Sequence, residues 1–308
     1  MARSHPPTLI RIAERTLAED TPLAHGDRIL VALSGGGDST ALLHVLAGLA
    51  PRLGVTLVAH GVDHGLRAEA AVELDQARDL ATRLDVPFSM TRVEVRPGGN
   101  VQARARAARR EALGAAKARH DATYIATAHH ANDRAETVLI RLLHGGTPAA
   151  LAVLPVVDGV WMRPLIRARK SDVLAHLARH ELPYAEDPSN ENRRFLRARV
   201  RHELLPLLEQ LSPSIVDHLT ALADEIASGP LPTVLDEDGR KVALGRAHSR
   251  ALERALRLGF AARIRLSEGR ELRVDPRAGA LCVEKSLKKP PSSTDNWNKG
   301  GAKRRKSG

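Results

Sequence analysis

The most constraining feature of this sequence is a glycine-rich segment between two apolar stretches. Residues 29–33 are ILVAL, residues 34–39 read Ser-Gly-Gly-Gly-Asp-Ser, and residues 40–46 are TALLHVL. This order predicts a buried strand, a tight loop and a helix. Glycines let the backbone approach an anion without a Cβ atom in the way, and the amides that open the helix point toward it. The segment therefore predicts a phosphate-binding loop, the simpler alternative being a glycine-rich turn without a ligand.

The loop differs from two common phosphate loops. It has no lysine, which the Gly-x-x-x-x-Gly-Lys-Ser/Thr loop requires, and Asp38 and Ser39 break the Gly-x-Gly-x-x-Gly spacing of dinucleotide-binding folds. The remaining pattern, Ser-Gly-Gly-x-Asp-Ser, resembles the pyrophosphate loop of the N-type ATP pyrophosphatases. Enzymes of that class cleave ATP between the α- and β-phosphates and transfer AMP to a substrate oxygen.

The distribution of strand and helix signals predicts an α/β fold. These signals alternate from residue 28 to about 144, which is typical of a doubly wound parallel sheet with helices on both faces. A helical segment and a small α+β C-terminal domain should follow. We expect an N-terminal helix or extension (1–24), a catalytic domain (25–227) that includes the helical segment (about 150–227), a small C-terminal domain (228–284) and a basic, disordered tail (285–308).

Composition limits the function classes. The 308 residues include no apolar stretch long enough to cross a membrane and no secretory leader, so we expect a cytoplasmic protein with no membrane partner. A homodimer is compatible with the sequence. The single cysteine, Cys282, excludes a disulfide within the chain and any Cys-x-x-Cys site.

The net charge of +11 favours an anionic partner. Residues 285–308 carry eight Lys/Arg and one acid, and residues 163–201 carry ten Lys/Arg and five acids. Aromatic residues are only 2% of the chain, so bases cannot stack on many exposed rings. Any RNA contact should therefore be mainly with phosphates and shape.

Two further polar clusters follow predicted strands, where ligands bind in doubly wound sheets. The pair Asp63-His64 could address a substrate or simply form a hydrogen-bonded turn. Residues 129–137 read HHANDRAET. Adjacent histidines point in different directions at a strand end, so we favour Mg²⁺ on Asp133 and Glu136 over zinc, although these two acids could also be a solvated first-turn pair.

Together with residues 99–106, 163–165 and 186–190, these clusters resemble the tRNA(Ile)-lysidine synthetases over about residues 25–220. The resemblance implies adenylation of the wobble cytidine of tRNA(Ile) with a CAU anticodon, followed by attack of free L-lysine. It implies ATP and Mg²⁺ as cofactors, with the helical segment facing tRNA.

The resemblance also implies roles for individual residues. Arg134 and Ala198 depart from the family pattern, where glutamine and asparagine are usual. The implied catalytic residues are Asp38, Asp63, His64, Asp133 and Glu136; the implied ATP-binding residues are Ser34, Gly35, Gly36, Gly37, Asp38, Ser39 and Arg106; the implied metal ligands are Asp38 and Asp133; and the implied RNA-binding residues are Arg109, Arg163, Arg197, Arg199 and Arg201.

Other activities are open to a chain of this kind. A tRNA thiolase of the same superfamily, or another nucleobase-adenylating ligase, would share the loop, but sulfur delivery needs more reactive cysteines than Cys282 alone. An amidating synthetase acting on a small acceptor would not need the basic segment at 163–201. A non-catalytic RNA-binding module would not need the intact loop.

Overall fold

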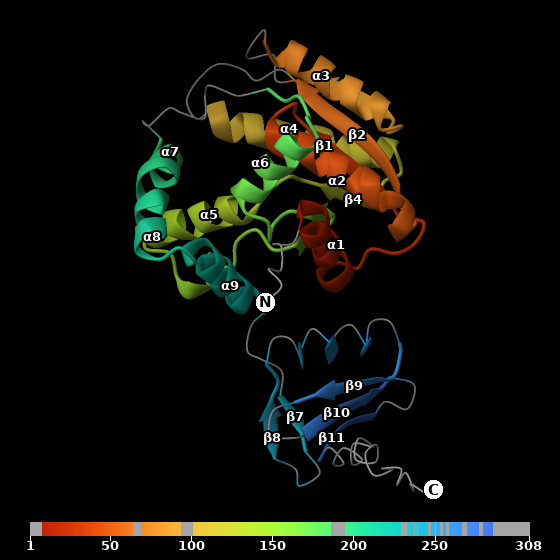
Figure 1. Cartoon of the computed structure of the whole chain (residues 1–308), viewed down its shortest axis with the longest axis vertical. Helices are drawn as coiled ribbons and strands as arrows, with labels where there is room; N and C mark the ends of the chain where they lie inside the picture. Colours follow the sequence, from red (N-terminus) through yellow and green to blue (C-terminus); the bar gives the residue numbers. More distant parts are fainter. Residues whose placement is uncertain are drawn as a thin grey trace, which may run out of the picture. The chain divides into compact units, whose positions relative to one another are not determined.

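The computed structural model describes residues 8–63, 69–93, 101–185 and 195–228, and most of 233–285. The chain forms two compact units that divide between Pro230 and Leu231 (Figure 1). His64 and residues 186–190 lie outside the described residues. Lys285, the first residue of the predicted tail, ends a strand, and residues 286–308 also lie outside the described residues.

The first unit is built on a six-stranded sheet, and the predicted α/β fold is confirmed. The strand order is β3-β2-β1-β4-β6-β5, in which β5 pairs antiparallel with β6 and all other pairs are parallel. The strands are β1 (Arg28–Leu33), β2 (Thr56–Asp63), β3 (Phe88–Arg92), β4 (Tyr124–Ala126), β5 (Val157–Asp158) and β6 (Trp161–Met162).

Helices cover both faces of the sheet. They are α1 (Leu9–Asp20), α2 (Gly37–Leu53), α3 (Glu69–Arg83), α4 (Val101–Arg119), α5 (Ala131–Leu143) and α6 (Lys170–Arg179). Ile29 and Val31 pack into one core with residues of α1, α2, α3 and α6, whereas Leu30 and Ala32 pack with α4 on the other face. Because β1 is buried on both faces, its sequence is continuously apolar instead of alternating.

The topology places two loops side by side. β1 lies between β2 and β4, so the chain order reverses at β1 and the loops that follow β1 and β4 open at the same edge. In doubly wound sheets this switch point is where ligands bind. The glycine-rich loop follows β1, and His129-His130 follow β4.

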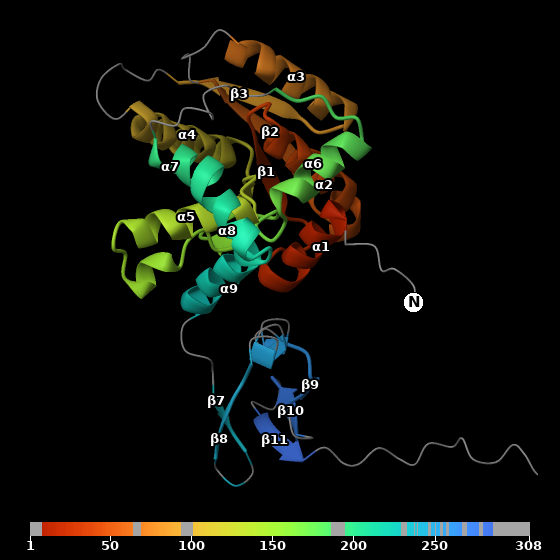
Figure 2. The same ribbon diagram turned by 60° about the vertical axis from the view of Figure 1, so that its left-hand side comes forward.

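The helical segment forms a separate small core around α5. Its elements are α7 (Leu196–Arg199), a π-helical turn (Val200–Leu204), α8 (Leu205–Leu211) and α9 (Ile215–Ser228). They gather beside α5 in both views (Figures 1 and 2), and Val200, Leu205 and Val216 pack with Val138.

The helical segment is divided into several helices, and one of its joints contains a proline. Pro206 has no amide hydrogen and its ring clashes with the carbonyl four residues earlier, so the helix widens at this point. The Leu205 amide accordingly donates to the Val200 carbonyl, five residues back. Ser212, in an extended conformation, then ends α8 before Pro213.

The second unit contains two small antiparallel sheets. One pairs β7 (Thr233–Leu235) with β8 (Lys241–Ala243), and the other has the order β11-β10-β9, with β9 (Ala262–Arg265), β10 (Arg270–Asp275) and β11 (Ala280–Lys285). Leu272 and Val274 on β10 are buried in its core. Across the described residues of both units, no helix is both long and apolar enough to span a bilayer.

Candidate functional site

The glycine-rich loop is shaped by close backbone approaches. Gly35 has a φ of +84°, and a Cβ atom there would lie 2.5 Å from the Glu73 carbonyl oxygen, so only glycine fits without rearrangement. The Ala185 amide donates to the Gly35 carbonyl at 3.1 Å, which braces the loop. The Ser39 hydroxyl closes the turn by donating to the Gly36 carbonyl at 2.9 Å, and it also accepts from the Ser34 amide at 3.1 Å.

The loop ends in the N-terminus of a long helix. α2 starts at Gly37 and runs for 17 residues, and its N-cap Gly36 makes no side-chain cap hydrogen bond. The first-turn amides of a helix have no intrahelical acceptor, and the helix dipole adds partial positive charge there. This loop therefore offers the donors that bind a phosphate group.

Asp38 stands in the first turn of α2 and has two nitrogen-bearing neighbours, Lys170 and His130. Its Oδ1 accepts a hydrogen bond from Lys170 Nζ at 2.6 Å, and its Oδ2 lies 3.6 Å from His130 Nε2. Burial alone would raise the pKa of Asp38, but the interactions with His130 and Lys170 lower this pKa to about 2. Asp38 is therefore ionised at neutral pH.

His130 joins Asp38 to Asp133. His130 is the N-cap of α5, and its backbone amide donates to Asp133 Oδ2 at 3.1 Å while its Nε2 lies 3.5 Å from the same carboxylate. Burial would raise the pKa of Asp133, but the interactions with His130, His129 and Arg197 hold it below its usual value. The carboxylates of Asp38 and Asp133, which are both predicted metal ligands, thus lie close to the same nitrogen, Nε2 of His130.

Glu136 lies one turn further along α5 and is bound by two guanidinium groups. Arg201 Nε donates to its Oε1 at 2.6 Å, and Arg197 Nε donates to its Oε2 at 2.9 Å. The Glu136 side chain is only 2% exposed. Arg197 also reaches Asp133 at 3.1 Å, so Arg197 and Arg201 attach the segment after residue 195 to α5.

Three arginine side chains contribute to lowering the pKa of His129, which lies at the end of β4. Burial lowers the pKa of His129 to about 4; Asp133 opposes this shift, and Arg163, Arg197 and Arg109 add to it. Arg163 is buried and donates to the Pro155 carbonyl at 2.6 Å, but its Nε has no hydrogen-bond partner. Burial lowers the pKa of both Arg163 and Arg109. The end of β4 is therefore a cationic environment.

The remaining candidate residues lie outside this cluster. Asp63 ends β2, where its carboxylate lies 3.7 Å from Arg92 Nε. Arg106 is exposed on α4. Arg199 is exposed and donates to Glu203 at 3.2 Å, one helical turn away. The structure thus brings together Asp38, Asp133, Glu136, Arg197 and Arg201, with Arg109 and Arg163 close to His129.

Comparison with known proteins decides the family. Residues 9–208 match the model of the PP-loop domain. A tRNA(Ile)-lysidine synthase of Thermobifida fusca is 35% identical over 290 residues, which are 91% of this chain and 86% of that protein. The chain belongs to the PP-loop family of tRNA(Ile)-lysidine synthases.

Other relatives in this family are longer. The tRNA(Ile)-lysidine synthases of Symbiobacterium thermophilum and Solibacter usitatus are 39% and 37% identical over 71% and 65% of this chain. The aligned part is only 47% and 46% of those two proteins, so the chain spans about half their length.

A solved structure shares the fold. The U34-tRNA thiolase NcsA from Methanococcus maripaludis superposes with a TM-score of 0.60 at 17% identity, over 71% of this chain and 79% of that chain. This likeness shows the fold alone. The PP-loop domain implies the use of ATP. Residues 34–39, the predicted phosphate-binding loop (hereafter the PP-loop), lie within the matched residues.

Sequence reasoning missed two members of this PP-loop site. Lys170 begins α6, and the Asn132 side chain fixes that helix start by accepting from the Lys170 amide at 2.9 Å. The sequence does carry a signal for His130, since this residue precedes the first turn of a predicted helix, where a side chain can cap the helix. No local pattern in the sequence pairs Lys170 with Asp38, 132 residues away.

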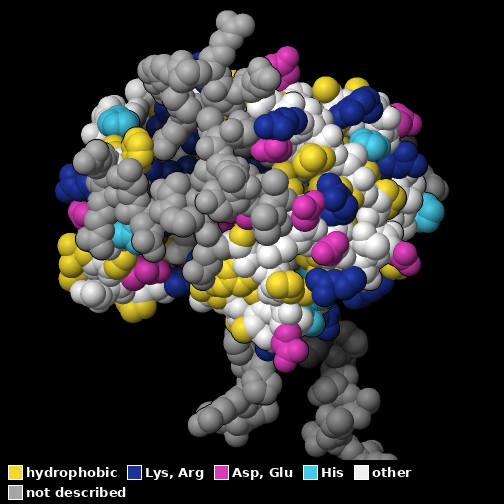
Figure 3. Space-filling view, turned by 90° about the horizontal axis from the view of Figure 1, so that it is seen from above, with side chains coloured by type: hydrophobic (Ala, Val, Ile, Leu, Met, Phe, Trp, Pro, Cys, Tyr) yellow, Lys and Arg dark blue, Asp and Glu magenta, His cyan; other side chains and the backbone are white. Residues whose placement is uncertain are grey.

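Basic side chains form no single patch on the described part of the face drawn in Figure 3. In Figure 3, lysine and arginine side chains are scattered among acidic and hydrophobic ones over the described part of the face. The described part of this face therefore shows no continuous basic patch of the kind that indicates an RNA-binding surface.

Proposed function

We propose that this chain joins free L-lysine to C2 of the wobble cytidine of tRNA(Ile) with a CAU anticodon. ATP activates the cytidine by adenylation with release of pyrophosphate, and the ε-amine of lysine then displaces AMP to give lysidine. The observation that carries the proposal is the match to the T. fusca protein across 86% of its length, combined with the intact PP-loop.

The PP-loop supplies the phosphate site. Its residues 34–39 place the first-turn amides of α2 where an anion binds, and Gly35 keeps the loop in a conformation that other residues would strain. Arg106, exposed on the neighbouring α4, is assigned to the nucleotide in this proposal. Neutralising phosphate charge in this way favours attack at the α-phosphate.

The carboxylates fit a Mg²⁺ ion. Asp38 and Asp133 offer oxygen ligands, which Mg²⁺ prefers, and both are held ionised because their pKa values are lowered. When bound, the ion would neutralise charge on the phosphates. Lys170 Nζ, 2.6 Å from Asp38 Oδ1, places a positive charge on the carboxylate that the ion would share.

The lysine substrate needs carboxylates and a proton acceptor. An ammonium group is attracted to carboxylates but must lose a proton before it can attack. Asp63, at the end of β2, and His64 are assigned to this part of the site from the family motif. Asp133 is assigned to metal and lysine, and Glu136 supports it from one turn away, where it holds Arg197 and Arg201.

The tRNA would meet the arginines around the end of β4 and on α7. Phosphate oxygens are suitable acceptors for a guanidinium group, and Arg163 is assigned to RNA from the family pattern although its side chain is buried in this structure. Arg109, Arg197 and Arg201 belong to the same region, and Arg199 is the exposed member. Arg197 and Arg201 already donate hydrogen bonds to Asp133 and Glu136. Only their remaining N–H groups would be available to RNA.

Sulfur transfer is less well supported than ligation. The thiolase resembles this chain at 17% identity, which supports a common fold and not a common reaction. Cys282 belongs to β11 in the second unit, whereas the PP-loop belongs to the first.

The nucleotide products test the reaction type. With ATP, Mg²⁺, lysine and unmodified tRNA(Ile), we expect one AMP and one pyrophosphate per modified tRNA. Formation of ADP and phosphate, or AMP formation that needs a sulfur donor, would contradict the proposal.

A further inference from the structure

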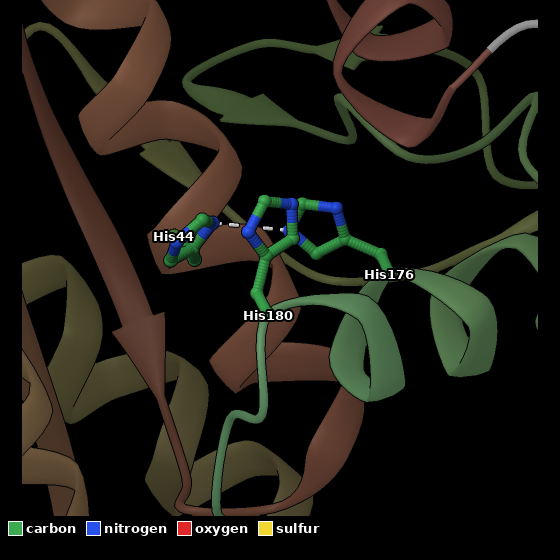
Figure 4. A group of neighbouring side chains, drawn as sticks. All are labelled: His44, His176 and His180. Atoms are coloured by element: carbon green, nitrogen blue, oxygen red, sulfur yellow. Dashed lines mark hydrogen bonds between the residues drawn. The ribbon is translucent and has the colours of Figure 1, made fainter.

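Three histidines outside the PP-loop site form a compact cluster. His44 on α2 faces His176 and His180, which come from α6 and its C-terminal cap (Figure 4). One ring nitrogen from each residue lies within 4.8 Å of the other two. His44 Nδ1 and His176 Nε2 are 3.1 Å apart and share a hydrogen bond. Among the described residues, no other His/Cys/Asp/Glu group of three or more has this geometry.

The cluster is built by helix geometry. His176 and His180 are four residues apart, which puts them on the same side of α6, with ring centroids 4.5 Å apart. The His44 ring centroid lies 5.0 Å from that of His176 and 4.6 Å from that of His180. His176 is buried, His44 is half-buried and His180 is exposed, so the cluster is anchored at one end and open to solvent at the other.

Two of the three rings, His44 and His176, have lowered pKa values, which favour the neutral form that binds metals. Burial, with the charges of His180, His44 and Arg179, lowers the pKa of His176 to about 4. Burial and His180 also lower the pKa of His44. Neutral imidazoles bind metal ions without first losing a proton, so protons compete weakly at neutral pH.

We propose that His44, His176 and His180 form a binding site for a divalent transition-metal ion of the Zn²⁺ class. Three imidazole nitrogens with an open fourth position suit Zn²⁺ or Co²⁺, whereas Mg²⁺ prefers oxygen ligands. The site is therefore chemically distinct from the carboxylates of the PP-loop site.

Metal binding requires only small movements of the three rings. With metal–nitrogen distances of about 2.0–2.1 Å, tetrahedral geometry places neighbouring nitrogens about 3.4 Å apart. The His44–His176 pair, at 3.1 Å, is already near that separation. The third ligand, His180, is the exposed member and is the one with room to rotate toward the other two.

The bound ion would connect α2 to α6. These two helices also carry Asp38 and Lys170 in their first turns, six residues before His44 and His176 respectively. A metal crosslink would therefore stabilise the helix pair that supports the PP-loop. This proposal does not depend on the reaction assigned to the chain.

Co²⁺ titration of the full chain, stripped of metal with a chelator, tests the proposal. Tetrahedral Co²⁺ gives visible absorption bands that report its ligands, so binding is read without an activity assay. We expect one equivalent to bind with these bands, and Zn²⁺ to displace it. The variants are His180→Ala and His44→Ala, and the control is His218→Ala, which removes an exposed histidine from α9.

The variants make the result decisive. We expect His180→Ala and His44→Ala each to weaken Co²⁺ binding at least about ten-fold, and His218→Ala to bind as the unaltered chain does. Zn²⁺ should raise the melting temperature of the unaltered chain and of His218→Ala only. Absence of Co²⁺ bands, or equal binding by all four proteins, would overturn the proposal and leave the three rings as a hydrogen-bonded packing cluster.

Discussion

Asp38 is the side chain on which the proposed chemistry most depends. It is the acidic group in the first turn of α2, and its lowered pKa keeps it charged beside the phosphate site. Asp38→Asn keeps the size and removes the charge, so we expect lysine incorporation to fall at least about 100-fold. The variant also loses the ion pair with Lys170, so we expect a modest fall in melting temperature, limited because the Asp38 side chain is 35% exposed.

Asp75→Asn is a suitable control for this variant, because Asp75 is an exposed carboxylate on α3 that pairs with Arg78. It should retain full activity. Unchanged activity in Asp38→Asn would show that the metal and phosphate assignment is wrong.

Arg134 illustrates a departure from the family pattern that the structure explains. The side chain is fully buried, and it donates to Asp224 on α9 at 2.7 Å and to the Val153 carbonyl at 2.9 Å. Asp224 also accepts from Arg167 at 2.8 Å. Arg134 therefore fastens α5 to α9, a role that needs the longer, charged side chain.

Removing the Asp224 charge should destabilise the first unit. Asp224→Asn leaves Arg134 buried without its counter-charge, so we expect a loss of about 3 kcal/mol in the free energy of unfolding at neutral pH. Burial would raise the pKa of Asp224, but the interactions with Arg134 and Arg167 hold it below its usual value. The stabilisation is thus complete above about pH 4 and is lost as the pH falls through the lower, folded-state pKa.

Urea unfolding at several pH values measures this effect. The difference between the unaltered chain and Asp224→Asn should shrink below pH 4. Arg134→Gln combined with Asp224→Asn should be less destabilised than Asp224→Asn alone, because no unpaired charge is then buried. A constant difference across pH would contradict the assignment.

The attachment of α7 and the π-helical turn to α5 depends on a few ion pairs. Glu136 accepts hydrogen bonds from both Arg197 and Arg201, and a glutamine has only one carbonyl oxygen with which to replace its carboxylate. We expect Glu136→Gln to increase amide hydrogen exchange over residues 196–211 and to leave β1 and α2 unchanged. Glu203→Gln, which affects only the exposed pair with Arg199, is the matched control. Equal exchange in both variants would refute this role.

The elements were largely predictable, for physical reasons that differ between regions. β1, α2 and α4 follow from apolar runs, glycines and helix periodicity, which are local signals. The π-helical turn could not be predicted, because Pro206 is compatible with either a break or a widened helix and packing against α5 decides between them. The pairing of Arg197 and Arg201 with Glu136 also depends on how the helices pack, so it could not be predicted from sequence. The family resemblance implies only an RNA-binding role for these two arginines.

At the scale of the complete chain, the charge is unevenly distributed. Residues 286–308 carry seven Lys/Arg and one acid, out of a net charge of +11. We expect their deletion to make tRNA binding less dependent on salt, with little change in the rate at saturating tRNA, because contacts with phosphates release counterions. A chain of full length with glutamine at these seven positions is the control for length. An unchanged salt dependence in both would show that the tail does not contact tRNA.

The family, and the sheet edge that carries the candidate site, can be predicted from the sequence. The long-range partners of the residues on α2 cannot. The PP-loop and the HHANDRAET segment are contiguous, so their spacing carried the information. Lys170 meets Asp38, and His44 meets His176, only because α6 packs beside α2. A homodimer stays a prediction from sequence.

Incorporation of labelled lysine into unmodified tRNA(Ile) with a CAU anticodon is the most direct test of the central proposal. The reaction contains ATP and Mg²⁺, and tRNA(Met), which has the same anticodon, serves as the control. We expect label in tRNA(Ile) alone, with release of AMP and loss of both signals in Asp38→Asn. No label in tRNA(Ile) under conditions in which the chain still binds ATP would contradict the proposed function.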